Sequence, residues 1–174
     1  MLLFILIIVF AVAADQLSKL LLYGKTLALI PKVVGVVRTS GLNTGAAWGL
    51  FGGKTGSVIA LCCFSVITLA ALVYVFVRYR GIMPKGIQIA LAMICGGAVG
   101  NLIDRVILGG VRDFINFEFV EFPVFNVADI FVTCGGVLLG VALLFTKSGR
   151  AFAGEFFKED KKQKPADPDT EAKA

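Results

Sequence analysis

The stretch GGAVGNLIDR, residues 96–105, brings an asparagine, an aspartate and an arginine to the end of a long apolar run. The run covers residues 86–108, long enough for a helix to cross about 30 Å of hydrocarbon. Asn101, Asp104 and Arg105 are spaced i, i+3 and i+4, so they share one face of that helix. A charged group near a bilayer core costs at least about 2.5 kcal/mol and by default marks a functional site.

Three further apolar runs cover about residues 1–22, 57–77 and 124–145. The 174-residue chain is 57% hydrophobic and 17% charged, whereas a soluble domain has about 25% charged residues. A chain with so few spans satisfies its backbone in lipid only as helices. We therefore predict an all-α membrane protein with four transmembrane helices. The alternative for the first run is a cleaved signal peptide, because residues 11–14 resemble a cleavage site, although no basic segment precedes the run.

The distribution of lysine and arginine predicts the orientation of the spans. Residues 78–85 contain three cations, and further lysines and an arginine follow the fourth run. By the positive-inside rule both segments are cytoplasmic, so we expect both termini in the cytoplasm and the loops at 23–56 and 109–123 on the opposite side. We expect residues 1–150 to form the membrane domain. Residues 151–174 are expected to be a disordered cytoplasmic tail, because they end in Lys, Glu, Asp, Pro and Ala.

The two loops on the extracytoplasmic side have patterns of their own. Residues 33–39 are rich in β-branched side chains and predict a small extended or hairpin element. The glycine-rich segment that follows predicts an interfacial helix or turn, and its Trp48 and Phe51 suit a head-group boundary. Residues 111–119 alternate imperfectly and predict a short strand or an amphipathic turn.

Polar residues of three spans lie at one depth in this orientation. Asp15 lies near the outer end of the first span, together with Lys19 one helical turn later, and Asn126 and Asp129 begin the fourth. Asp113 follows in the short outer loop, from which it can approach Asp129. Two acids that share a proton can activate water, and the chain has no histidine. An acid in a loop or at a helix N-terminus can equally be structural, so both interpretations stay open on this evidence.

Small and sulfur-containing residues are expected to serve packing. Gly96, Gly97 and Gly100, and likewise Gly135 and Gly136, would let helices approach closely. The four cysteines lack metal-ligand spacing and lie in apolar runs, which is typical of packing residues. The basic residues cluster beside apolar runs, a pattern of topology signals and lipid contacts rather than of nucleic-acid binding.

Five motifs together resemble the lipoprotein signal peptidases (signal peptidase II), in order, in spacing and in hydropathy over about residues 1–147. They are Asp15-Gln16-x-x-Lys19, Asn43-x-Gly45-Ala46-Ala47, Gly96-Gly97-Ala98-x-Gly100-Asn101-x-x-Asp104-Arg105, Val111-x-Asp113-Phe114 and Phe125-Asn126-x-Ala128-Asp129. The resemblance implies an aspartyl endopeptidase of the bacterial inner membrane. Such an enzyme removes the signal peptide of a diacylglyceryl-modified prolipoprotein just before the lipidated cysteine.

Site residues follow from the resemblance position by position. Asp113 and Asp129 match the catalytic dyad. The residues that match groups orienting the dyad or contacting substrate are Asp15, Asn43, Asn101, Arg105 and Asn126. The resemblance further implies a small sheet and an interfacial helix over the site. We expect no cofactor, no metal and no nucleic acid, with prolipoproteins and membrane lipids as partners of a monomer.

Three other classes of protein fit the sequence less well. An ion-coupled transporter tends to place its acids near the midplane and to contain internal repeats, whereas these acids gather at one surface. A structural membrane protein needs no close pair of acids. An intramembrane serine protease needs a histidine or lysine base, and histidine is absent.

Overall fold

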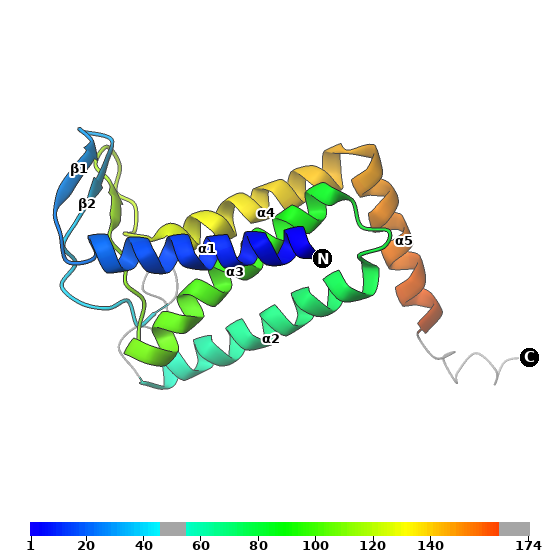
Figure 1. The fold of residues 1–174 in the computed structure, drawn as a ribbon, viewed down its shortest axis with the longest axis horizontal. Coiled ribbons are helices and arrows are strands. Elements are labelled where there is room, and N and C mark those ends of the chain that lie inside the picture. Colours follow the sequence, from blue (N-terminus) through cyan, green and yellow to red (C-terminus); the bar gives the residue numbers. More distant parts are fainter. Residues whose placement is uncertain (46–54, 164–174) are drawn as a thin grey trace, which may run out of the picture.

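The computed structural model describes residues 1–45 and 55–163 of the chain. Four long helices form an elongated bundle, with a small sheet at one end and a fifth helix across the other (Figure 1). The elements are α1 (Leu2–Leu22), β1 (Leu27–Ile30), β2 (Val34–Val36), α2 (Thr55–Tyr79), α3 (Lys85–Leu108), β3 (Ile115–Phe117), α4 (Val127–Phe145) and α5 (Lys147–Gln163).

The four expected spans are confirmed. Among the described residues, four helices are long and apolar enough to cross a membrane, and they correspond to α1, α2, α3 and α4. The helix α3 lies at the centre of the bundle, where it packs against the other three. The fourth span begins at Val127, a few residues later than expected, because Asn126 caps the helix in an extended conformation.

Glycines allow the close approach of helices that the sequence predicted. A Cβ added to Gly97 would collide with the carbonyl oxygen of Ala128 on α4 and would lie 2.8 Å from a methyl group of Val132. Similar close contacts surround Gly96, Gly100 and Gly135. Gly136 differs, because no atom lies within 4 Å of the position that its Cβ would take. The expectation is therefore confirmed for four of these five glycines and is wrong for Gly136.

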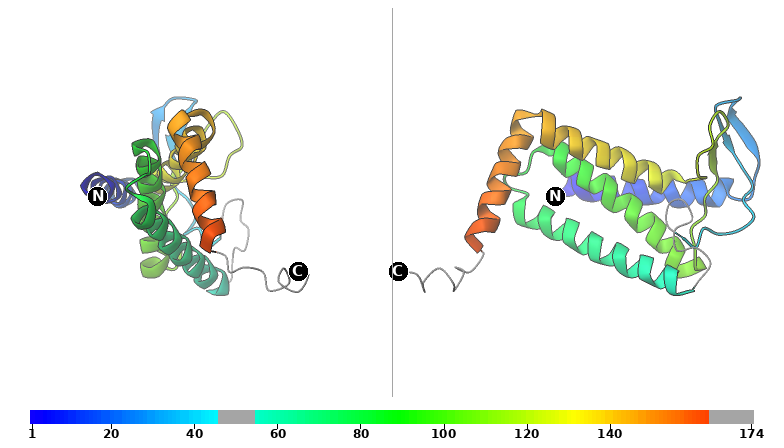
Figure 2. Two further views of the ribbon diagram at one scale, coloured as in Figure 1. Left: turned by 90° about the vertical axis from the view of Figure 1, so that its right-hand side faces the viewer. Right: turned by 180° about the vertical axis from the view of Figure 1, so that it is seen from behind.

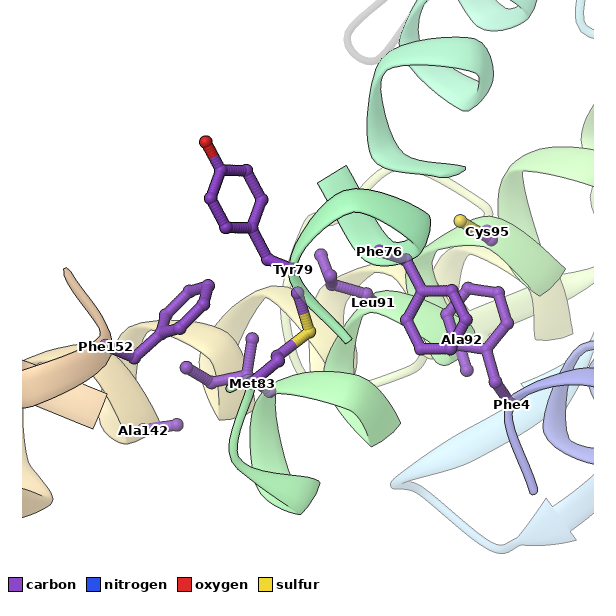
Figure 3. Packing of buried hydrophobic residues seen from close by; sticks show 10 residues of the cluster. Phe4, Phe76, Tyr79, Met83, Leu91, Ala92, Cys95, Ala142 and Phe152 are labelled. Atoms are coloured by element: carbon purple, nitrogen blue, oxygen red, sulfur yellow. The ribbon is translucent and has the colours of Figure 1, made fainter. Parts of the chain in front are cut away.

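The hydrophobic core is concentrated at the end of the bundle that carries α5. Phe4 of α1 stacks on Phe76 of α2, with ring centroids 3.6 Å apart and planes inclined by 9° (Figure 3). The buried residues of this cluster are Phe4, Phe76, Tyr79, Met83, Ile87, Leu91, Ala92, Cys95, Ala142 and Phe152. A second, smaller cluster of Val36, Phe114 and Ile115 lies at the opposite end, beside the sheet.

The expected extracytoplasmic β element is present as an antiparallel sheet in the order β1-β2-β3. Gly109 adopts a left-handed conformation with φ 76° and ends α3, so that the chain turns toward β3. The register places Val36 opposite Ile115, which joins the loop after α1 to the loop after α3. An isolated bridge between Asn43 and Val111 extends this junction. The expected interfacial helix, with Trp48 and Phe51, falls on residues 46–54, outside the described ranges.

The C-terminal segment differs from the expected disordered tail. The helix α5 extends through Gln163, well beyond residue 150. Its Phe152 is buried and meets Tyr79 edge to face, at a centroid distance of 6.2 Å. Phe156, one turn later, lies 4.9 Å from the same ring. This i, i+4 aromatic pair gives a short polar helix the tertiary packing that its composition alone does not predict.

Candidate active site

A cavity of about 760 Å³ lies between α3, the start of α4 and the loops that adjoin the sheet. The carboxylates of Asp113 and Asp129 line it, together with Asn43, Asn101 and Arg105. Much of the remaining lining is apolar: Leu42, Val111, Phe117, Phe122, Pro123, Val124, Phe125, Ile130 and Val132. The cavity therefore combines a few polar groups with a large apolar wall, as ligand sites commonly do.

Asp113 is held by two amide groups. Its Oδ2 accepts a hydrogen bond of 2.8 Å from Asn43 Nδ2, and its Oδ1 accepts one of 2.6 Å from Asn126 Nδ2. The backbone around it is also tied to the first loop, because Thr39 Oγ1 donates to the Asp113 carbonyl at 3.2 Å. The side chain is 7% exposed, so the carboxylate meets solvent mainly through the cavity.

Asp129 lies in the first turn of α4 and forms a capping box with Asn126. The Asp129 N–H donates to Asn126 Oδ1 at 3.1 Å, and the Asn126 N–H donates to Asp129 Oδ2 at 3.1 Å. Such reciprocal bonds satisfy N–H groups that a helix leaves unpaired at its start. The other oxygen, Oδ1, accepts a bond of 2.8 Å from Asn101 Nδ2.

Two asparagines bridge the carboxylates. Asn126 Nδ2 donates both to Asp113 and, at 3.1 Å, to Asn101 Oδ1, while Asn101 donates onward to Asp129. The oxygen of Asn126 is occupied by the helix N–H, which turns its NH₂ group toward Asp113. Helix capping and the orientation of the two acids are thus coupled through one fully buried side chain.

Lys19 lies behind the asparagines and is 1% exposed. Its Nζ donates to Asn101 Oδ1 at 3.0 Å and to Asp15 Oδ2 at 2.8 Å. Asp15 in turn accepts a 2.9 Å bond from the N–H of Ala128. A buried charge is tolerated only when it is paired and hydrogen-bonded, and here the pairing joins α1 to the start of α4.

The fully buried Asp104 forms an ion pair with Arg112, whose side chain is 18% exposed. Arg112 Nη2 lies 2.7 Å from Asp104 Oδ1, Nε lies 3.2 Å from Oδ2, and the Arg112 N–H also reaches Oδ2 at 3.0 Å. The same guanidinium donates to Gln16 Oε1 at 3.0 Å. Lys19 completes the group at 3.4 Å from Asp104. Arg112, which directly precedes Asp113, is therefore bonded to both α3 and α1.

The electrostatics of the loop groups follow from this geometry. Burial, with the nearby Asp129 carboxylate, raises the pKa of Asp113 above its ordinary value, against the opposing effects of Asn43, Asn126 and the Lys19 charge. The hydrogen bond to Asp104 raises the pKa of Arg112, so this guanidinium stays charged. Neighbouring acids that resist joint ionisation share a proton as one coupled pair.

The residues singled out in the sequence converge on this end of the bundle. Five of them line the cavity, while Asp15 and Asn126 are buried behind it. Gln16, Lys19 and Arg112 are additional members of the network that the list of expected site residues omitted. The spacing of Asp15 and Lys19 signals a shared helical face, whereas the pairing of Arg112 with Asp104 depends on the loop path. Asp104 pairs with Arg112 and Lys19, and Arg105 lines the cavity instead.

Comparison with known proteins agrees with the fold. The family described as signal peptidase (SPase) II matches residues 7–145. Lipoprotein signal peptidases of Staphylococcus aureus strains MRSA252 and Newman are each 38% identical over 156 residues, covering 84% of this chain and 90% of theirs.

Two solved structures share the architecture. Each is described as a bacterial membrane enzyme structure obtained by the in meso method. The first, at 2.3 Å resolution, has a TM-score of 0.70 and 38% identity, and covers 81% of this chain and 87% of its own. The second, at 1.9 Å, has a TM-score of 0.68 and 37% identity, and covers 83% and 94%. With four membrane helices, a matching family profile and close relatives over most of its length, the chain belongs to the lipoprotein signal peptidase (signal peptidase II) family.

Proposed function

We propose that this protein is an aspartic-type endopeptidase that removes the signal peptide from diacylglyceryl-modified prolipoproteins, with Asp113 and Asp129 as its catalytic pair. The observation that carries the proposal is the bridging of two carboxylates at one cavity by Asn101 and Asn126. A purely structural role would not require two acids to face the same space. Family membership supplies the class of substrate.

The chemistry begins with one proton shared by the two carboxyl groups. The ionised acid removes a proton from water, and the resulting hydroxide attacks the scissile carbonyl. The protonated acid donates a hydrogen bond to the developing oxyanion and then gives its proton to the leaving amine. The asparagine bridge keeps both acids in position, so little reorganisation accompanies the reaction.

The other site residues position the two acids or bind the substrate. Asn43, Asn101 and Asn126 orient the acids by the hydrogen bonds described above, and Asp15 secures the start of α4 through the Ala128 N–H. Arg105 lines the cavity without belonging to the Asp104–Arg112 pair, so its guanidinium is placed to bind a substrate carbonyl. The apolar wall suits the signal peptide and the acyl chains.

The protein is proposed to lie in the bacterial cytoplasmic membrane as a monomer, with its active site near the extracytoplasmic surface and both termini in the cytoplasm. Support comes from the positions of the cations. Arg78, Arg80 and Lys85 are exposed at the end of the bundle away from the cavity, which the positive-inside rule assigns to the cytoplasm (Figure 1).

The test is cleavage of a diacylglyceryl-modified prolipoprotein by the purified full-length protein. Asp113→Asn and Asp129→Asn should each reduce kcat by about 10²–10⁴-fold, the usual contribution of a general acid or base. Glu121→Gln is the matched control, because Glu121 is an exposed acid in the loop that connects β3 to α4. The control should cleave at the wild-type rate.

Near-wild-type cleavage by either aspartate variant would overturn the dyad. A chelator should leave the rate unchanged, because the two acids activate water without a metal. Loss of activity with the chelator, restored by one divalent cation, would instead indicate a metal-dependent reaction.

A further inference from the structure

The helix α5 leaves α4 through an ordered elbow. Thr146 Oγ1 donates to the Ala142 carbonyl at 2.7 Å and accepts from the Gly149 N–H at 2.9 Å. A Cβ at Gly149 would collide with the same carbonyl, so only glycine permits this tight turn. Arg150 Nη1 adds a bond of 3.0 Å to the Leu144 carbonyl. The direction of α5 is therefore built into the fold.

From this elbow α5 runs across the end of the bundle, roughly perpendicular to the four spans (Figures 1 and 2). Phe152 and Phe156 hold it against Tyr79, the last residue of α2. Because the spans define the membrane normal, a helix that crosses their ends lies along the membrane surface. The whole of α5 lies outside the segment that matches the family, which ends at residue 145.

The exposed side chains of α5 combine an aromatic ring with cations. Phe157 is 63% exposed, next to the half-buried Phe156. Six exposed basic residues lie on α5 and on the adjacent α2–α3 turn (residues 78–85). They are Arg78, Arg80, Lys85, Lys147, Arg150 and Lys158. Among the described side chains of residues 72–92 and 137–158, Glu155 is the single acid. By sequence, the whole of α5 has five basic and three acidic residues.

We propose that α5 and the α2–α3 turn form a docking surface for anionic phospholipid head groups. The cations lie at the ends of the spans, where the phosphate groups of lipids form the bilayer surface. Phe157 suits the boundary between head groups and acyl chains. Amphipathic helices with basic polar faces and aromatic apolar faces bind membrane surfaces in this way. The surface is separate from the candidate active site, which lies at the other end of the bundle.

The test uses the purified full-length protein in an uncharged detergent. Phosphatidylglycerol should raise the thermal unfolding midpoint, whereas phosphatidylcholine should have little effect. Lys147→Gln/Lys158→Gln removes two cations but leaves Arg150 on the Leu144 carbonyl. Each cation near an anionic surface contributes about a fivefold factor in affinity, so the double variant should bind phosphatidylglycerol about 25-fold more weakly.

The matched control is Lys25→Gln/Lys32→Gln, which removes two exposed lysines at the opposite end of the bundle. The control should keep the wild-type response, and about 1 M salt should abolish that response. An equal response to phosphatidylglycerol in wild type and Lys147→Gln/Lys158→Gln would overturn the proposal. So would an equal loss in both double variants, or a change in oligomeric state with Lys147→Gln/Lys158→Gln in place of a change in lipid binding. Prolipoprotein cleavage by both variants reports that they are folded.

Discussion

The ammonium group of Lys19 lies 3.0 Å from the Oδ1 of Asn101, and both side chains are buried. Because this oxygen is occupied by Lys19 and by Asn126, the NH₂ group of Asn101 is directed to Asp129 at 2.8 Å. A positive charge on α1 therefore determines which end of an amide on α3 faces an acid on α4. Lys19 is thus a positioning residue for the proposed reaction, since it acts on Asp129 through Asn101.

Replacing Lys19 with methionine should lower kcat by about 10²-fold, because a small displacement of a catalytic group commonly has that effect. The positive charge also lowers the pKa of Asp113, so its removal should move the alkaline limb of the pH–rate profile to higher pH. The measurement is prolipoprotein cleavage against pH, with the fraction of folded protein determined separately.

Lys25→Gln serves as the control for Lys19→Met, because Lys25 is an exposed cation just beyond α1. It should change neither kcat nor the profile. A purely structural role for Lys19 predicts a different result: less folded protein, with an unshifted profile for the remainder.

The raised pKa of Asp113 predicts a pH dependence of stability. Burial and the adjacent Asp129 raise this pKa above its value in the unfolded chain, which is about 3.9. An acid shifted upward adds stability below its unfolded pKa, and this contribution is lost as the pH rises through the folded pKa. Asp113→Asn lacks this pH-dependent contribution, because an asparagine side chain does not ionise. The thermal midpoint of the variant, minus that of wild type, should therefore increase as the pH rises above about 4, and a constant difference would contradict the prediction.

Sequence reasoning was most successful where a pattern repeats along a helix. Spacings of three and four residues place Asn101 and Asp104 on one face, and hydropathy places the polar ends of α1, α3 and α4 at one depth. The structure confirms this convergence, with bonds from Lys19 to Asn101 and from Ala128 to Asp15. Local periodicity suffices here because a membrane helix has a known length and direction.

Contacts that depend on a loop path were not predictable in this way. Arg112 reaches Asp104 only because Gly109 turns the chain back over the end of α3, and no periodic pattern encodes that return. The helix α5 was missed for a different reason. Its charged composition favours disorder, and its order depends on two rings that meet Tyr79 from a distant part of the chain.

Breaking the Asp104–Arg112 pair should destabilise the protein and displace Asp113. Arg112→Gln leaves the buried Asp104 with Lys19 at 3.4 Å, with Gln16 and with a backbone N–H, so we expect a loss of about 1–3 kcal/mol, the usual cost when a buried polar group loses one partner. Arg112→Lys should recover little of this stability, because an ammonium group cannot contact both oxygens of Asp104 as the guanidinium does. Thermal unfolding in detergent measures the loss.

Arg38, an exposed arginine just after β2, provides the control for Arg112. Arg38→Gln removes the same charge and should change the free energy of unfolding by less than about 0.5 kcal/mol. Equal effects of the two substitutions would show that net charge, not the buried pair, is responsible.

Two glycines in helices offer a matched pair of substitutions with opposite expected outcomes. Gly97→Ala places a methyl group against the Ala128 carbonyl, which cannot move without shifting the start of α4 and therefore Asp129. It should lower both the thermal midpoint and kcat, because overpacking of this kind costs about 1–3 kcal/mol. Gly136→Ala meets no atom within 4 Å and should stabilise α4 by about 0.5–1 kcal/mol, with cleavage unchanged. If Gly97→Ala left kcat at the wild-type value, the close packing of α3 on α4 would not be what positions Asp129.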